Sequence, residues 1–98
     1  MAEQRQHKRG TTVYISVTIR DVTDALVDPS SIVVSVSEFT TGTLKVTSAT
    51  MTKISTGKYY YNCQTGDSWT VDWYNVLIVA VSGGYTVKIE DTKSFKLV

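Results

Sequence analysis

The side chains that could perform covalent or acid–base chemistry are few in this chain and far apart. There is one histidine, His7, in the polar start of the chain, and one cysteine, Cys63. A Ser-His-Asp or Cys-His arrangement needs a nucleophile held beside its base, and this distribution offers no such pair. A zinc site needs about three or four protein ligands, and no phosphate-binding or dinucleotide-binding glycine motif is present. We therefore expect no enzymatic activity, no catalytic residue, no metal and no cofactor.

Three carboxylates lie close together in the polar connection over residues 20–31. Asp21, Asp24 and Asp28 resemble a calcium-binding cluster in composition, because calcium prefers several carboxylate oxygens. Their spacing matches no known calcium loop, and Asp28-Pro29 fits a turn in which the aspartate bonds the following backbone. We expect aspartates that form turns and keep the surface soluble.

A basic cluster occupies the first ten residues. Arg5, His7, Lys8 and Arg9 stand there against the single acid Glu3, with no apolar spacing. Residues 1–10 are therefore expected to form a polar, extended N-terminal arm that frays by itself. The cluster could bind an acidic patch on a protein partner, or remain a solvated tail. Nucleic acid is not expected as a partner, because the other basic residues are dispersed and the net charge is only +1.

Aromatic side chains are the remaining candidates for binding. Tyr59, Tyr60 and Tyr61 are consecutive and cannot all point inward in a strand. An exposed-looking Trp69 lies in a loop predicted over residues 65–72, and Trp73 follows that loop. Exposed Tyr and Trp are common anchors at protein interfaces and stacking surfaces for sugars. The alternative is local packing under the loop. Tyr60, Trp69 and Trp73 join the basic cluster as candidate partner-binding residues.

The elements that would position these residues are strands. Apolar and polar residues alternate over residues 12–19, so that Val13, Ile15, Val17 and Ile19 would share one buried face. Similar short segments occur at residues 32–38, 44–46, 49–54, 58–64, 85–89 and 94–98. The longest segment, residues 73–82, is apolar on both faces. Such a strand is either central under a cover or pressed against another protein.

About seven or eight short strands, separated by turns every 8–12 residues, predict an all-β fold. The pattern favours one antiparallel β-sandwich over residues 11–98, in which each strand turns one face to a shared core. With a single cysteine no intrachain disulfide can form. We find no secretory signal and no stretch long enough to span a bilayer, so we expect no association with a membrane. We also expect that the chain is made in a reducing compartment.

Three stretches resemble immunoglobulin-like modules of tailed-virus (phage) particles and prokaryotic surface proteins. The stretches are Val27-Asp28-Pro29-Ser30-Ser31-Ile32 before a Val-x-Val strand, Ser55-Thr56-Gly57-Lys58-Tyr59-Tyr60-Tyr61 after Met51-Thr52-Lys53, and Tyr74-x-Val76-x-Ile78-x-Ala80 before Gly83-Gly84. Together they cover most of residues 11–98. The chain departs from antibody-type domains because it has no disulfide pair.

The resemblance implies a non-enzymatic structural protein of a tailed-virus particle, such as a head decoration, neck or tail component. Such a subunit would assemble in the host cytoplasm, reside in the virion and dock on other particle subunits as part of an oligomeric assembly. The alternative is a carbohydrate- or cell-surface-binding immunoglobulin-like module, in which Tyr60, Trp69 and Trp73 form the stacking platform. A plain spacer domain in a larger assembly is a third reading.

Overall fold

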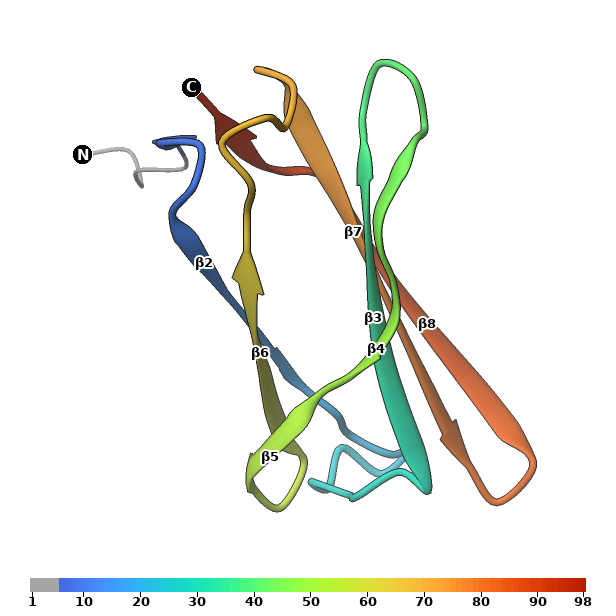
Figure 1. Ribbon diagram of the computed structural model, residues 1–98. Coiled ribbons are helices and arrows are strands. Elements are labelled where there is room, and N and C mark those ends of the chain that lie inside the picture. The colour runs from blue at the N-terminus through green and yellow to red at the C-terminus, as the bar shows by residue number, and fades with distance from the viewer. Residues whose placement is uncertain (1–5) are drawn as a thin grey trace.

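Two stacked β-sheets form the protein, as the alternation of apolar and polar residues predicts (Figure 1). The computed structural model describes residues 6–98. Its strands are β1 Gln6–His7, β2 Thr12–Thr18, β3 Ser31–Glu38, β4 Leu44–Thr50, β5 Thr52–Ser55, β6 Lys58–Gln64, β7 Trp73–Ser82 and β8 Tyr85–Leu97. The larger sheet has the order β1-β8-β7-β3-β4, and the smaller has the order β2-β6-β5. The predicted all-β sandwich is confirmed.

The core lies between the two sheets and consists of the residues that alternate inward. Val13, Ile15 and Ile19 enter it from β2 and its end, while Val34, Val36, Tyr74 and Leu97 are among its most deeply buried members. The remaining buried apolar residues are Ile32, Met51, Tyr59, Cys63, Val76, Ile78, Ala80 and Phe95. Each side chain removed from water contributes about 1.5–3 kcal/mol, so this two-sided layer is the main source of stability.

The connection between β4 and β5 carries the chain from one sheet to the other. The sequence predicts separate short strands over residues 44–46 and 49–54, but β4 runs through residue 50 with an irregularity at Ser48, where φ is +48°. The Ser48 N–H donates to Ser35 Oγ at 3.0 Å, which bridges the irregularity. Met51 is buried between the sheets at the crossing point, and β5 then begins in the smaller sheet.

The last part of the N-terminal segment differs from the expected frayed arm. β1 pairs in parallel with the end of β8, so not every strand neighbour is antiparallel. The Val98 N–H donates to the His7 carbonyl at 2.9 Å, and the Arg9 N–H donates to the Val98 carbonyl at 3.1 Å. The Gly10 N–H donates to Thr65 Oγ1 at 3.0 Å. These contacts involve mainly backbone groups and require no alternation of apolar residues in residues 6–10. The sequence pattern therefore did not predict them. Residues 6–10 are part of the sandwich.

No helix long and apolar enough to cross a membrane occurs in residues 6–98.

Candidate docking surface

The described residues of the basic cluster, His7, Lys8 and Arg9, lie at one end of the sandwich. Arg5 lies outside the described residues. Lys8 and Arg9 are exposed, and Arg9 Nη1 donates to the Trp69 carbonyl at 3.3 Å. His7 is half-buried, with its ring edge-on to the Phe95 ring at 6.2 Å. His7 therefore packs on the protein's own core, while Lys8 and Arg9 face solvent.

Trp69, which the sequence allows as an exposed anchor or as a residue packed under its loop, is half-buried and packs on the core. Its indole covers Gly66 so closely that a Cβ there would come 2.8 Å from Trp69 Cδ1. Its ring lies 5.7 Å from the Tyr74 ring, and Lys45 Nζ stands 5.9 Å from the indole centre. Satellite packing under the loop, the alternative weighed for this residue, is what the geometry gives. The small Gly66 and the curvature of the loop allow this packing. Neither feature can be inferred from the alternation of apolar and polar residues in strands.

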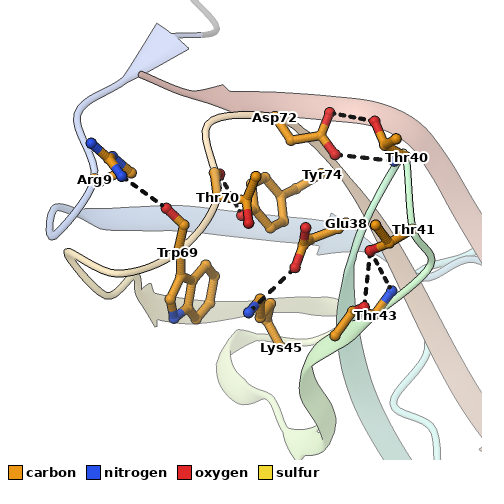
Figure 2. Close-up of polar contacts among 10 residues, drawn as sticks. All are labelled: Arg9, Glu38, Thr40, Thr41, Thr43, Lys45, Trp69, Thr70, Asp72 and Tyr74. Atoms are coloured by element: carbon orange, nitrogen blue, oxygen red, sulfur yellow. Dashed lines mark hydrogen bonds and ion pairs between the residues drawn. The ribbon is translucent and has the colours of Figure 1, made fainter.

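Polar contacts close this end of the sandwich around Trp69 (Figure 2). Tyr74 Oη donates to the Thr70 carbonyl at 2.7 Å, and burial raises the pKa of this phenol to about 12, with the nearby Glu38 and Asp72 carboxylates adding to the rise. Lys45 pairs with the buried Glu38 at 3.3 Å. Tyr74 thereby fixes the loop to β7, and the Glu38–Lys45 pair joins β3 to β4 beside Trp69.

Asp72 sets the start of β7. Its carboxylate accepts hydrogen bonds from the Thr40 N–H and the Thr40 hydroxyl, both at 3.0 Å (Figure 2). It also accepts one from the Trp73 N–H at 2.8 Å. Although burial opposes it, this set of donors holds the pKa of Asp72 below its usual range. These hydrogen bonds therefore fix the backbone position of Trp73, the first residue of β7.

From Trp73 onward, β7 presents a second apolar row on the side of the larger sheet that faces away from the core. Trp73, Leu77, Val79 and Val81 are half-buried and alternate with the core residues, with the polar Asn75 between Trp73 and Leu77 on the same side. Val33 of β3 stands opposite Val79 and extends the row. We call these five apolar residues the outer apolar face. The smaller sheet covers only the other side of the larger sheet (Figure 1).

Charged side chains border the outer apolar face along β8. Lys88 stands opposite Val79, Glu90 opposite Leu77, and Lys96 opposite Trp73, with Lys96 Nζ 6.0 Å from the indole centre. An apolar centre with a charged rim is the usual anatomy of a protein interface. Sequence reasoning predicted the doubly apolar strand and Trp73, but missed Val33 and the rim, because these depend on the strand register.

Tyr60 lies on the opposite side of the molecule. It points outward from the smaller sheet, where its ring stacks on the Tyr14 ring with 5.6 Å between centres. Trp73 points outward from the larger sheet, and Trp69 packs at the end of the sandwich. The three aromatic residues proposed as one stacking platform are therefore not brought together, and no flat ligand could contact both Tyr60 and Trp73.

The aspartates of the connection between β2 and β3 act as turn and fastening residues. Asp21 accepts hydrogen bonds from the Thr23 hydroxyl and from two backbone N–H groups, which lower its pKa. Asp28 accepts from Lys53 at 2.6 Å, from the Gly57 N–H at 2.9 Å and from Tyr59 Oη at 3.1 Å. The Lys53 ammonium is the main cause of the lowered pKa of Asp28. Asp28 thus ties this connection to the turn between β5 and β6.

Cys63 is an inert core residue. Its side chain is buried, and burial raises the pKa of the thiol to about 11, so that the nucleophilic thiolate is scarce near neutral pH. Within residues 6–98, no group of three or more His, Cys, Asp or Glu side chains is arranged to hold a metal ion.

Comparison with known proteins found no match: no protein family, no curated protein and no solved structure is similar enough to count.

Proposed function

We propose that the chain is a non-enzymatic structural subunit of a tailed-virus particle, and that it docks on neighbouring subunits through the outer apolar face. The observation that carries the docking is β7, which buries one row of apolar side chains in the core and presents a second row outward. An apolar row of this kind is stabilised when a partner excludes water from it. Trp73 at one end supplies the large aromatic anchor that interface hot spots favour.

The viral setting rests on the resemblance of residues 27–32, 51–61 and 74–84 to immunoglobulin-like particle modules. Head decoration, neck and tail roles are all compatible with a two-sheet domain that presents a flat docking face. In this proposal the subunit assembles in the host cytoplasm, and its partners are other protein subunits of the particle. Lys8 and Arg9, which are exposed at the end of the sandwich, supply a secondary contact to an acidic patch.

The strand register allows a test that disturbs the surface while keeping the fold. Leu77→Lys would place an ammonium opposite Glu90, and Val79→Glu would place a carboxylate opposite Lys88. Each new charge thus meets an opposite charge across the strands, so the folded domain should tolerate it. A charge at the centre of an apolar interface should instead reduce incorporation into particles about tenfold or more.

The measurement is the amount of tagged protein in particles purified from the native source, with Asn62→Lys on the outer side of β6 as the matched control. Circular dichroism and thermal melting of each variant confirm folding. We expect normal incorporation of Asn62→Lys and loss of Leu77→Lys and Val79→Glu. Absence of the wild-type chain from every particle fraction would refute the viral role. Equal incorporation of all variants would refute docking through this face.

A further inference from the structure

Within residues 6–98, the outer strands of the two sheets are β1, β4, β2 and β5, and β8 also has an unpaired side beyond its short pairing with β1. The longer of these strands differ in how they are protected against pairing with another chain. β4 has two register irregularities and a left-handed Ser48. β5 has only four residues and an irregularity after Lys53. β8 is interrupted near Lys93, where φ is +55°, and its end is already paired with β1. Bulges, short length and charges of this kind are the devices by which proteins prevent pairing at a sheet edge.

β2 carries none of these devices. All seven residues pair with β6 in one unbroken register, and no strand of residues 6–98 lies beside the other edge of β2 (Figure 1). The segment Thr12–Thr18 contains no charged residue, no proline and no glycine. Beside its free edge the sandwich is open toward β8, with a cavity of about 530 Å³ lined by Val13, Ile15 and Val17 among others. The free edge is therefore accessible.

The hydrogen bonds to β6 show which backbone groups remain free. The Thr65 N–H donates to the Thr11 carbonyl, and the Ile19 N–H donates to the Gly57 carbonyl, which marks the odd-numbered residues as those bonded to β6. In an antiparallel ladder the residues in between turn their N–H and C=O groups to the other side. Thr12, Tyr14, Ser16 and Thr18 thus present their backbone groups at the free edge.

The sequence of β2 is nearly the same in both directions. Thr-Val-Tyr-Ile-Ser-Val-Thr, read backwards, differs only by the exchange of Tyr14 and Ser16. In an antiparallel pair of two copies centred on Ile15, Thr12 meets Thr18, Val13 meets Val17, and Tyr14 meets Ser16. The even-numbered residues then fall in the hydrogen-bonded pairs, in agreement with the free backbone groups, and would exchange about eight hydrogen bonds.

We propose that two copies of this chain dimerise by antiparallel pairing of their β2 edges, with Ile15 of each copy at the two-fold axis. The pairing joins the two smaller sheets into one continuous sheet. The Tyr14 side chain, 59% exposed in the single chain, lies over the small Ser16 of the second copy. The arrangement is isologous, since the same surface serves both copies. The proposal does not depend on the viral role, because it concerns the purified chain alone.

Two double variants test the register with a matched control. T12K/T18K places like charges opposite each other at both symmetry-related pairs, whereas T12E/T18K places opposite charges there. Both variants lose the hydrogen bond from Thr12 Oγ1 to Gln64 equally. Sedimentation velocity of the wild type over a wide concentration range should show a monomer–dimer equilibrium. The dissociation constant of T12K/T18K should exceed that of T12E/T18K about tenfold or more.

Hydrogen exchange gives an independent readout. Dimer formation should slow exchange of the amides of Thr12, Tyr14, Ser16 and Thr18, while the odd-numbered amides are already protected by β6. A wild-type chain that stays monomeric at all concentrations overturns the proposal, and protection of these amides only in the presence of another protein would assign the edge to a foreign strand instead. Equal dimerisation of the two double variants overturns it as well, since another surface must then be responsible.

Discussion

Gly57 forms the turn between β5 and β6 at a point where backbone conformation and packing both require glycine. Its φ is +75°, and a Cβ there would come 2.8 Å from the Ile19 carbonyl oxygen and 3.0 Å from Leu26 Cβ. The carbonyl belongs to backbone that is itself hydrogen-bonded to this turn, so it cannot easily move. The turn and the end of β2 are therefore packed backbone against backbone.

Gly57→Ala should destabilise the fold by about 2–4 kcal/mol, because it adds a steric clash to the cost of a left-handed alanine. Gly42→Ala is the matched control: Gly42 has the same φ of +75°, but nothing lies within 4 Å of the added Cβ. That variant should lose only about 1 kcal/mol. Urea unfolding of the two variants measures the difference, and equal losses would show that the contact with Ile19 is not restrictive.

Asp28 makes the free energy of unfolding depend on pH in the acid range. Its folded-state pKa lies below the ordinary value of 3.8, with the Lys53 hydrogen bond as the main cause. The folded state therefore holds its proton less readily than the unfolded chain, and the stabilisation is fully present above about pH 4 and is lost as the pH falls through the lowered pKa. Asp28→Asn should be less stable than the wild type at neutral pH, and the two should converge in acid.

Asp24→Asn provides the comparison for this experiment. Asp24 lies in the same connection, but its side chain is largely exposed and its nearest cation, Arg20, is 3.8 Å away. Exposed pairs of this kind contribute little. Thermal melts between neutral and acid pH should therefore follow the wild type for Asp24→Asn. Melting curves of Asp28→Asn that stay parallel to the wild type at every pH would contradict the role assigned to Asp28.

At the scale of elements, β1 shows how a two-residue strand can decide where a domain begins. It contributes no apolar alternation, yet it and the residues after it are held by hydrogen bonds. His7 and Arg9 bond the Val98 backbone, and Gly10 bonds Thr65 Oγ1 and Gln64 Nε2. The His7 ring adds a contact to Phe95. Residues 6–10 therefore belong to the folded part of the chain.

Two truncations separate the arm from the fold. A chain that begins at residue 6 keeps the hydrogen bonds of His7, Arg9 and Gly10 and the ring contact of His7 with Phe95. It should therefore retain the wild-type melting temperature. A chain that begins at residue 11 loses the hydrogen bonds of His7, Arg9 and Gly10 to the rest of the sandwich, at about 1 kcal/mol each. Its melting temperature should therefore fall by about 10 °C or more. Differential scanning calorimetry of the two truncations and the full chain measures this. If the shorter chain melts with the full chain, β1 does not stabilise the sandwich.

At the scale of the whole molecule, hydrophobic alternation sufficed to predict two sheets and core residues such as Val13, Ile15 and Ile19. Alternation reports which face of a strand is buried, and that is a local property of the chain. It does not report which strands are neighbours. The pairing of Val33 with Val79, the parallel attachment of β1 and the free edge of β2 depend on long-range register. The surfaces available for docking were therefore only partly predictable.

The loop over residues 65–72 shows a second limit of sequence reasoning. The sequence left two positions open for Trp69, an exposed anchor or local packing under the loop, and the loop curves back and lays the indole on Gly66 and Tyr74. Burial there follows from the shape of the loop and from a small residue beneath the ring. The candidate binding residues therefore lie in different places. Trp73 lies on the outer apolar face, whereas Trp69 packs at the end of the sandwich.

The shared core also predicts how the whole fold responds to alkali. The folded protein keeps Cys63 protonated until about pH 11, whereas the unfolded chain loses this proton near pH 9. Between these values the unfolded state binds fewer protons, so stability falls as the pH rises, by about 1.4 kcal/mol per pH unit from this one group. Lysines and exposed tyrosines titrate in the same range, so a comparison with Cys63→Ala is needed to isolate the thiol.

Cys63→Ala should lower stability at neutral pH by removing buried volume, but it should remove the contribution of the thiol to the alkaline slope. The free energies of unfolding of the two proteins should therefore approach each other by about 2–3 kcal/mol between pH 9 and pH 11. Urea titrations at several pH values give these energies. Curves that stay parallel would mean that the thiol ionises inside the folded protein, which would require water to reach the centre of the sandwich. Modification of Cys63 by a thiol reagent should then be rapid without unfolding, whereas a dry core allows modification only as fast as the sheets separate.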